Sequence, residues 1–383
     1  MKAEVSTLGI IGGGQLGMFL AQACQKIGLI THIYSDTDDA PAKKYANKII
    51  YGSFNDHKKL NEFRKNVDLL TYEFENVAIK TLKQINKQIK IYPPISALEI
   101  SQDRKKEKLF FSKNKIKHAG LFFINKKTNL NKFKDKINFP VILKTCRFGY
   151  DGKGQYKVKN FSDLKNKWKK LDYQSCVIEK VIKFDRELSV ICSRNIKKNI
   201  CFYPPFENIH KNHILFETIS PSQIDEKINK QLIRISKKIL NKLNYIGLLT
   251  IEFFLDDENN IYVNEIAPRV HNSGHITLDN ANMSQFELHI KAITKDKIKT
   301  PKIIKKGLMR NLIGNEIKRT KQISKLKSYK VYKKKKAYDY GKKAIKQGRK
   351  MGHINFVKKI KSLYFMWTSV FPSAKNPQIL ICS

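Results

Sequence analysis

The stretch Leu8-Gly-Ile-Ile-Gly-Gly-Gly-Gln-Leu-Gly17 decides the fold of the first hundred residues. Its first four residues are an apolar run that predicts a buried strand, and Leu16–Lys26 has the periodicity of a helix. Gly12, Gly14 and Gly17 permit a tight turn and a close approach of a phosphate to backbone N–H groups at the helix N-terminus. Taken alone, this motif fits phosphate binding and close packing of helix on strand equally well.

The rest of the N-terminal part repeats this alternation of strand and helix. Strands are predicted at Thr31–Tyr34, Lys48–Tyr51, Asp68–Tyr72 and Ile89–Tyr92, and a helix at Lys80–Lys87. Strands separated by helices imply an α/β fold with a parallel, doubly wound, Rossmann-like sheet. Pro93-Pro94 interrupts the pattern, so the first domain is expected to span residues 1–100.

An α+β organisation begins at about residue 101. Helices at Asp103–Lys113 and Glu226–Asn244 accompany short strands that we expect to be mostly antiparallel. These strands are predicted at Pro140–Lys144, Tyr156–Val158, Val177–Val181, Leu188–Cys192, Ile200–Tyr203, Leu249–Phe254 and Ile261–Ile266. A Lys-rich segment then carries strand-like stretches at Leu308–Ile313, Ser328–Tyr332 and Gly352–Val357. The expected domains are therefore 1–100, 101–300 and a small β-rich 301–383.

A lysine and a glycine-rich segment follow one another in the second domain. The strand Val141-Ile-Leu-Lys144 leads to Phe148-Gly-Tyr-Asp-Gly-Lys-Gly-Gln155. A lysine ammonium is a compact charge for a phosphate, and mobile glycines let N–H donors close over a triphosphate. The segment is not a P-loop, because no Gly-Lys-Ser/Thr sequence opens a helix. An ordinary glycine-rich hairpin explains the pattern equally well.

Glu252 and Glu265 lie on two adjacent predicted strands, each among apolar residues. A carboxylate there is costly unless it is paired or binds a metal ion, so the two could converge on Mg²⁺ that bridges nucleotide phosphates. A pair of solvated glutamates fits these surroundings poorly. The loop that follows holds Arg269, which could stabilise an anionic intermediate. It also holds His271 and His275, which could transfer protons or only hydrogen-bond.

The chain is strongly basic, with 75 Lys and Arg against 33 Asp and Glu, a formal charge of +42, and only ten of the basic residues are Arg. Lysine is spread through every segment together with Asn and Ile, a combination that AT-rich codons encode. This favours compositional drift over a nucleic-acid interface, and we expect no specific nucleic-acid partner. Arg349 in Gly348-Arg-Lys-Met-Gly-His353 stands out, because Arg is suited to bidentate phosphate contact.

Cysteine spacing and hydropathy predict a cytoplasmic protein. The cysteines are Cys24, Cys146, Cys176, Cys192, Cys201 and Cys382. They form no CxxC pair and are expected to be reduced and mostly buried. No apolar run reaches the ~18 residues of a membrane span, so no membrane association is expected. Val5–Ala23 is apolar, but Glu4 and Gly12–Gly14 argue against a signal peptide.

Several segments match, in order, the pattern of one known family over nearly the whole chain. They are GGGQLG (12–17), TYEFENV (71–77), QDR (102–104), LK (143–144), GYDGKGQ (149–155), EKVI (179–182), RELSV (186–190), ENIH (207–210), NEIAPRVHNSGH (264–275), SQFEL (284–288) and GRKMGH (348–353). The chain thereby resembles the N5-carboxyaminoimidazole ribonucleotide synthetases of purine biosynthesis, which are ATP-grasp ligases. The resemblance implies a pre-ATP-grasp domain, a central ATP-grasp domain with a glycine-rich lid at about 118–182, and a C-terminal domain.

The resemblance also implies roles for individual residues. The ATP site is expected at Arg104, Lys144, Gly149, Tyr150, Asp151, Gly152, Lys153, Gly154, Gln155, Glu179, Lys180, Val181, Ile182, Glu187, His210, Asn264 and Glu265. Magnesium, or manganese in its place, is expected on Glu252 and Glu265. The ribonucleotide is expected at Gln15, Glu73, Asn272, Ser273, Gly274, Lys342, Arg349 and Lys350. Lys144, Arg269 and His271 are expected to act in catalysis.

The implied reaction is the carboxylation of 5-aminoimidazole ribonucleotide with bicarbonate and ATP, which gives N5-carboxyaminoimidazole ribonucleotide, ADP and phosphate in de novo IMP synthesis. Bicarbonate attacks the γ-phosphate, and the resulting carboxyphosphate delivers CO₂ or its equivalent to the exocyclic amine. Positioning, rather than a protein nucleophile, is expected to drive this phosphoryl transfer. Relatives imply a homodimer.

Three alternatives were weighed against this function. A formate-dependent glycinamide ribonucleotide transformylase shares the domain layout and is the runner-up, but TYEFENV and VHNSGH favour the carboxylating enzyme. An NAD-dependent oxidoreductase would rest on the glycine motif alone and leave Lys144, Glu252 and Glu265 unexplained. A nucleic-acid-binding protein would rest on net charge alone.

If the positive charge has no specific nucleic-acid role, binding to random RNA should be lost between about 50 and 200 mM salt, as counterion release requires. Filter binding against a panel of RNA sequences measures this. Sequence-selective binding that survives the higher salt concentration would contradict the prediction.

Overall fold

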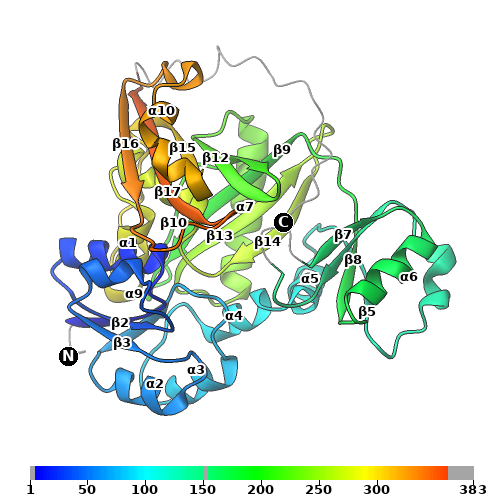
Figure 1. Cartoon of the computed structure of the whole chain (residues 1–383), viewed down its shortest axis with the longest axis horizontal. Helices are drawn as coiled ribbons and strands as arrows, with labels where there is room; N and C mark the ends of the chain where they lie inside the picture. The colour runs from blue at the N-terminus through cyan, green and yellow to red at the C-terminus, as the bar shows by residue number, and fades with distance from the viewer. Residues whose placement is uncertain (1–4, 150–153, 361–383) are drawn as a thin grey trace.

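The computed structural model describes residues 5–149 and 154–360. Its N-terminal part, blue to cyan in Figure 1, holds a parallel sheet of order β3-β2-β1-β4, which confirms the predicted Rossmann-like arrangement. The elements here are β1 (Thr7–Ile11), α1 (Gln15–Lys26), β2 (Ile30–Ser35), β3 (Lys48–Tyr51), α2 (His57–Arg64), β4 (Leu69–Tyr72), α3 (Ile79–Ile85) and α4 (Ile95–Ser101).

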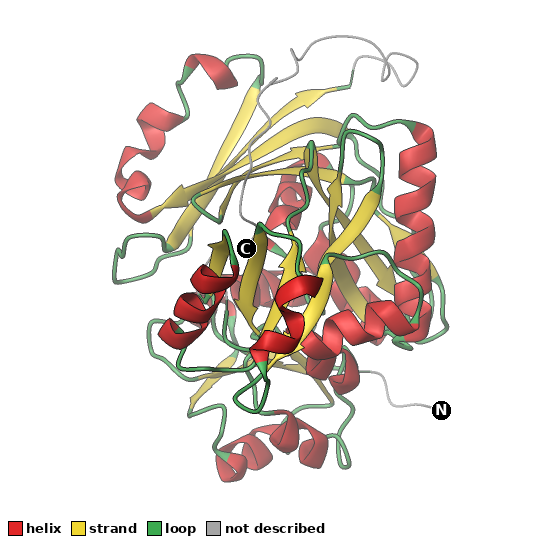
Figure 2. Ribbon diagram, turned by 90° about the vertical axis from the view of Figure 1, so that its right-hand side faces the viewer, coloured by secondary structure: helices red, strands yellow, loops and turns green. Residues whose placement is uncertain are grey.

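A nine-stranded antiparallel sheet carries the centre and the C-terminal end of the described chain. Eight strands follow the order β14-β13-β9-β11-β12-β15-β17-β16, and β10 pairs with β9. The strands are β9 (Arg186–Arg194), β10 (Ile200–Phe202), β11 (Phe206–Lys211), β12 (Ile214–Ser220), β13 (Gly247–Leu255), β14 (Ile261–Ala267), β15 (Lys305–Ile313), β16 (Lys334–Asp339) and β17 (Lys350–Lys359). Because β12 pairs with β15, the C-terminal strands extend the central sheet (Figure 2).

Helices pack around this sheet. They are α5 (Arg104–Lys113), α7 (Glu226–Lys242), α8 (Thr277–Asn280), α9 (Gln285–Thr294) and α10 (Thr320–Ile323). The long helix α7 buries Ile228, Leu232 and Ile239 in one core with strands β9 and β13. The helix confirms the one predicted at Glu226–Asn244, and its apolar face packs on the sheet while its lysines lie outside.

A smaller antiparallel sheet stands at one side of the molecule in Figure 1. Its order is β5-β8-β6-β7, formed by β5 (Gly120–Ile124), β6 (Val141–Thr145), β7 (Gln155–Val158) and β8 (Cys176–Lys180), with α6 (Phe161–Lys170). Leu143, Val158, Trp168 and Ile178 form its own core. The sheet occupies the range in which the resemblance implied a lid.

The buried ring of Phe19 on α1 joins three regions of the chain. It lies 5.0 Å from the ring of Phe286 on α9 and 6.1 Å from that of Tyr340, which follows β16. Burial of an aromatic side chain contributes roughly 1.5–3 kcal/mol. These contacts fix α1, and the glycine turn before it, against the central sheet and the C-terminal region.

Two predicted strands are wrong. Ile89–Tyr92 makes one isolated bridge, between Ile91 and Leu70, because the prolines that follow cannot donate the N–H groups that would extend the pairing. Ser328–Tyr332 forms part of a 3₁₀ turn, with Tyr329 stacked 4.4 Å from Phe356 of β17. Tyr329 and Tyr332, three positions apart, both contact the ring of Phe356 from this turn.

The strand β16 was missed because its lysines resemble a solvated tail. Lys334, Lys335 and Lys336 are exposed, as is typical of an edge strand protected from further pairing.

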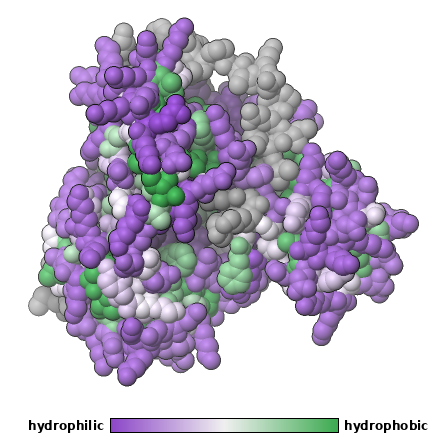
Figure 3. Space-filling model, in the orientation of Figure 1, coloured by the Kyte–Doolittle hydropathy of each residue, from purple (hydrophilic) through white to green (hydrophobic). Residues whose placement is uncertain are grey.

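On the face in Figure 3, hydrophilic residues cover most of the described surface. The described cysteines are all unpaired and buried, as predicted, whereas Cys382 lies outside the described residues. Across residues 5–149 and 154–360, no helix is long and apolar enough to cross a membrane.

Replacement of Gly12 by Ala should disrupt the turn between β1 and α1. Gly12 has φ of +119°, and a Cβ there would lie 2.6 Å from Glu73 Cγ. We expect about 1–3 kcal/mol of destabilisation from the backbone conformation alone. Chemical denaturation of G12A measures it, with G28A as a control, because Gly28 also has positive φ but nothing lies near its Cβ position. Equal losses in the two variants would show that the contact with Glu73 is unimportant.

Candidate active site

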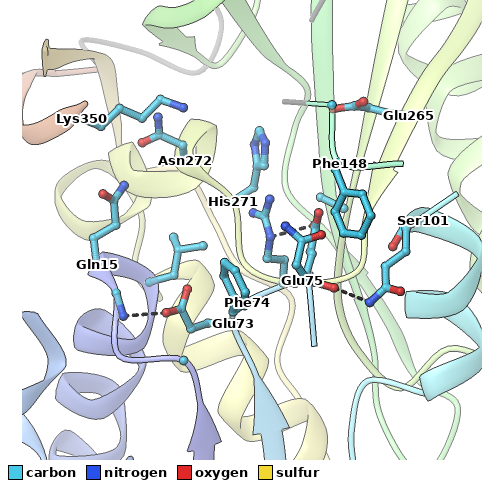
Figure 4. A pocket seen from close by; sticks show the side chains of 18 of the residues that line it. Gln15, Glu73, Phe74, Glu75, Ser101, Phe148, Glu265, His271, Asn272 and Lys350 are labelled. Carbon is cyan, nitrogen blue, oxygen red and sulfur yellow. Dashed lines mark hydrogen bonds and ion pairs between the residues drawn. The ribbon is translucent and has the colours of Figure 1, made fainter. Parts of the chain in front are cut away.

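A cavity of about 720 Å³ opens where the N-terminal sheet, the central sheet and the C-terminal region meet. Thirteen of the predicted site residues line it: Gln15, Glu73, Arg104, Gly149, His210, Glu252, Glu265, Arg269, His271, Asn272, Lys342, Arg349 and Lys350. In Figure 4, Gln15 and Lys350 lie on one side of the cavity and Glu265 on the other, with His271 between them. A volume of this size suits a nucleotide-sized ligand.

The other predicted residues do not line this cavity. Buried beside it or deeper are Lys144, Glu179, Asn264, Ser273 and Gly274. Partly exposed or exposed, and also absent from its lining, are Gly154, Gln155, Lys180, Val181, Ile182 and Glu187. Tyr150, Asp151, Gly152 and Lys153 lie outside the described residues.

The two predicted metal ligands face each other across a strand pair. Glu252 on β13 and Glu265 on β14 are direct register partners, next to an irregularity in the pairing. Burial, with the charge of Glu265, raises the pKa of Glu252 to about 8. Two ionised carboxylates in an apolar hairpin therefore repel one another, and a bound cation would favour their charged form.

This donor set fits a hard divalent ion that also takes oxygen ligands from a nucleotide. Two carboxylates alone do not form a complete site, and residues 5–149 and 154–360 contain no cluster of three or more His, Cys, Asp or Glu arranged to hold a metal. Mg²⁺ usually takes only one or two protein carboxylates, and water and phosphate oxygens complete its shell. The pair thus suits a nucleotide-bound Mg²⁺ better than a resident structural metal.

Arg269 and His271 enter the cavity from the loop after β14. Arg269 Nε lies 2.8 Å from Glu75 Oε1, and Arg269 also donates to its neighbour's carbonyl oxygen. His271 Nδ1 lies 2.9 Å from Ser273 Oγ, and its Nε2 lies 3.4 Å from Glu252 Oε1. Burial, and then the charge of Arg269, lowers the pKa of His271 well below its usual value. His271 is therefore a neutral imidazole.

Glu187 on β9 and His210 on β11 form a direct ion pair at the wall of the cavity. Burial alone would lower the pKa of His210, but the charge of Glu187 raises it above its ordinary value. Because β9 and β11 are neighbours in the sheet, residues from separate motifs meet here. The resemblance placed both residues of this pair in the ATP site.

Lys144 is buried within the small β5-β8-β6-β7 sheet and paired with Glu179. Lys144 Nζ lies 2.8 Å from Glu179 Oε2, and each side chain is 4% exposed. Both stand on adjacent antiparallel strands, β6 and β8. Near them, Arg104 donates to the carbonyl oxygens of Thr145 and Gly149, at 3.0 and 3.1 Å, and so ties α5 to the start of the glycine-rich segment.

On the opposite side, the N-terminal turn meets the C-terminal region. Gly14 donates its backbone N–H to Glu73 Oε1 at 2.7 Å, and Lys342 Nζ donates to Gln15 Oε1 at 2.8 Å and to the Lys350 carbonyl at 2.6 Å. Burial, followed by the charge of Arg349, lowers the pKa of Lys342 to about 8. Four predicted ribonucleotide ligands thus converge from residues more than three hundred positions apart.

Two further groups complete this side of the cavity. Arg349 donates to Asp39 Oδ2 at 3.0 Å and to the Ala344 carbonyl at 2.8 Å, so it belongs to the cavity wall and not to a loose basic tail. The side-chain amide of Asn272 is buried, and neither its nitrogen nor its oxygen has a hydrogen-bond partner among the described residues. An orphaned buried amide at a cavity wall is a ready contact for a polar ligand.

Sequence analysis missed several groups at this site. Glu75 holds Arg269, Asp39 holds Arg349, and Glu107 accepts from the backbone N–H of Ile266 at 2.8 Å. Glu75 lies in the quoted segment TYEFENV, which was the available signal. Asp39 and Glu107 carried no such signal, because their partners are distant in sequence.

Known domain models match along the chain in the order that the fold displays. They are the ribonucleotide synthetase pre-ATP-grasp domain at residues 5–102, the ATP-grasp domain at 109–286, and the phosphoribosylaminoimidazole carboxylase C-terminal domain at 307–362. The fold and the site therefore define an ATP-grasp ligase with a mixed α/β architecture.

Individual relatives identify the family to which the chain belongs within the ATP-grasp ligases. N5-carboxyaminoimidazole ribonucleotide synthase of Bacillus subtilis is 36% identical over 353 residues, which is 92% of each chain. The structure of the Staphylococcus aureus N5-carboxyaminoimidazole synthetase complexed with ADP superposes with a TM-score of 0.85, at 35% identity over 92% of this chain and 93% of that one. The chain belongs to the N5-carboxyaminoimidazole ribonucleotide synthase family, as its motifs predicted.

A third structure shows what one relative binds. The Aspergillus clavatus N5-carboxyaminoimidazole synthase, in complex with ADP and 5-aminoimidazole ribonucleotide, has a TM-score of 0.83 at 26% identity, over 93% of this chain and 94% of that one. Near-complete coverage in both directions shows that all three regions of the fold are shared.

Affinity for ribose 5-phosphate should fall above about pH 8, because Lys342 is a cation below its pKa of about 8 and neutral above it. Once Lys342 is neutral, the affinity should drop up to tenfold for each further pH unit. Calorimetric titration of wild type and Lys342→Arg measures this. The arginine stays charged, so its profile should be flat, and a parallel fall in both proteins would assign the titration to another group.

Proposed function

We propose that this chain uses ATP to carboxylate 5-aminoimidazole ribonucleotide with bicarbonate, giving N5-carboxyaminoimidazole ribonucleotide, ADP and phosphate. One observation carries the proposal. A single cavity joins an acidic end, at Glu252 and Glu265, to a basic end, at Lys342 and Arg349. The acidic end suits a metal-bound nucleotide and the basic end suits the phosphate of a second substrate. The ligands named for relatives, ADP and 5-aminoimidazole ribonucleotide, support the same pairing.

At the acidic end, Arg104 and Lys144 would hold the ATP phosphates. Glu252 and Glu265 would hold Mg²⁺, which would neutralise charge that develops on the phosphates when it is bound. His210, which Glu187 holds in place, would offer its imidazole to the nucleotide from the cavity wall. Arg104, Lys144 and His210 already have their orientation set by protein partners, which favours preorganised binding.

At the other end, Lys342, Arg349 and Lys350 would bind the ribonucleotide phosphate, and Asn272 would hydrogen-bond the base or ribose. Bicarbonate oxygen attacks the γ-phosphorus, ADP leaves, and carboxyphosphate forms. The exocyclic amine nitrogen then bonds to the carboxyl carbon as phosphate departs. Arg269, which lies between the two ends, would stabilise the carboxyphosphate anion. The neutral His271 can accept the proton that the amine loses.

The decisive experiment measures ADP release while bicarbonate, formate and 5-aminoimidazole ribonucleotide are omitted in turn. The proposal requires a dependence on bicarbonate and the ribonucleotide, with formate unable to replace bicarbonate. Formate-dependent ADP release with glycinamide ribonucleotide would instead favour the transformylase.

We also propose that the chain acts as a cytoplasmic homodimer, with domains at 1–100, 101–300 and 301–383. The family resemblance supports the dimer. Sedimentation equilibrium tests it directly, and a single species at the monomer mass of 44.5 kDa would contradict it.

Glu265→Gln should lower kcat by roughly 100-fold or more, because the variant keeps the side-chain shape but removes a charge that positions Mg²⁺. Added Mg²⁺ should restore the rate only in part, since geometry is lost along with occupancy. The fold should survive, because the change relieves repulsion with Glu252. Steady-state ADP formation against Mg²⁺ concentration measures the effect.

Glu258→Gln is the matched control for this variant. Glu258 lies in the turn of the same hairpin and is exposed, so it should leave the rate and the Mg²⁺ dependence unchanged. Circular dichroism verifies folding. A folded E265Q enzyme with wild-type kcat and Mg²⁺ dependence would show that Glu265 does not bind the metal.

A further inference from the structure

Lys108 is unusual in a chain whose lysines are mostly solvated. Among the described lysines, only Lys108 and Lys144 are buried, at 2% and 3% exposure. A buried ammonium is costly unless opposite charge and hydrogen-bond acceptors surround it. Lys108 therefore needs a structural or functional reason, whereas exposed Lys106, on the same helix, does not.

The partners of Lys108 come from three elements. Its Nζ lies 3.4 Å from Glu179 Oε1 on β8 and 3.6 Å from Glu107 Oε2 on its own helix α5, and it donates to the carbonyl oxygen of Asn264 on β14. The ammonium thus connects the small β5-β8-β6-β7 sheet to the central sheet. Burial alone would lower the pKa of Lys108, but the charges of Glu179 and Glu107 raise it, so Lys108 stays a cation.

Glu179 is shared between two ammonium groups. Its Oε2 pairs with Lys144 Nζ at 2.8 Å and its Oε1 faces Lys108. Burial opposes ionisation of Glu179, but Lys108 and Lys144 lower its pKa to about 2, so it is ionised. The triad of Lys108, Glu179 and Lys144 therefore carries a net charge of one positive unit. Without Lys108, Glu179 would neutralise Lys144.

The charges around this triad do not replace Lys108. Arg104 is a further cation near the triad, but its hydrogen bonds go to the neutral carbonyl oxygens of Thr145 and Gly149, so it does not pair with Glu179 in place of Lys108. Burial raises the pKa of Glu107 to about 7, and its Oε1 accepts from the N–H of Ile266. Glu265 adds negative charge on the cavity side. Lys108 is therefore the cation that pairs with the Glu179 oxygen that Lys144 does not hold.

We propose that Lys108 is a positioning residue of the nucleotide site: by neutralising Glu179 from behind, it leaves the charge of Lys144 available to nucleotide phosphates. This rests on the proposed function insofar as Lys144 binds phosphate. Lys108 itself does not line the cavity and acts only through Glu179 and Lys144.

The test compares ADP binding by calorimetry in wild type, Lys108→Met, Glu179→Gln and the double variant. Removing one buried charge near the phosphates should raise the Kd of K108M for ADP about tenfold. The double variant regains a triad charge of one positive unit, so its Kd should return to within about threefold of wild type. Lys108→Arg should retain affinity, and the KM for the ribonucleotide should stay within about twofold throughout.

Lys106→Met is the matched control, because Lys106 is exposed and paired only with Glu99 at 2.6 Å. It should bind ADP as wild type does. Wild-type affinity in folded K108M would overturn the proposal, as would a double variant that binds no better than K108M, since a packing defect is not repaired by removing Glu179. If K108M does not fold, the double variant is compared with E179Q: about tenfold weaker binding supports the proposal and equal binding overturns it.

The same measurements separate this proposal from the proposed function. Protein that binds ADP but does not couple ATP cleavage to bicarbonate and the ribonucleotide would contradict the proposed function. The Lys108 comparison would still stand, because it measures nucleotide binding alone.

Discussion

Burial of like charges is the constraint on which this structure depends. Glu252 and Glu265 are register partners in an apolar hairpin, and the carboxyl of Glu252 resists ionisation there. Such a pair is stable as a charged site only when cations approach it. The surrounding architecture provides them: Arg269 from the following loop, His210 from β11, and Arg104 from α5 all reach the same cavity.

The arrangement of sheets explains how residues so distant in sequence meet. Because β15 and β17 extend the central sheet, the loop with Lys342 and Arg349 returns to the glycine turn before α1. The packing of Phe19 against Phe286 and Tyr340 holds that turn in place. The basic end of the cavity therefore forms only when the N-terminal sheet docks on the central sheet, which couples substrate binding to the contact between the two.

Local patterns predicted most elements, because glycine turns, strand alternation and helix periodicity are properties of short segments. The family and most of the thirteen cavity residues came from the resemblance that the quoted motifs carry. Elements whose state depends on distant partners were harder to predict. Ser328–Tyr332 alternates like a strand yet packs its aromatics on β17 from a turn, and β16 is a strand despite its lysines. Likewise, nothing adjacent to Lys108 in sequence indicates that Glu179 lies beside it.

Most of the positive charge of this chain comes from lysines on the surface, whereas arginines are placed at the cavity. Lysine serves on the surface, where a flexible point charge suffices and drift in composition costs little. Four of the ten arginines line the cavity, and three of these, Arg104, Arg269 and Arg349, each hold two oxygen partners at once. A planar guanidinium can satisfy two directed acceptors from one position, whereas an ammonium cannot fix their geometry in the same way. Compositional drift toward lysine is therefore compatible with an intact site.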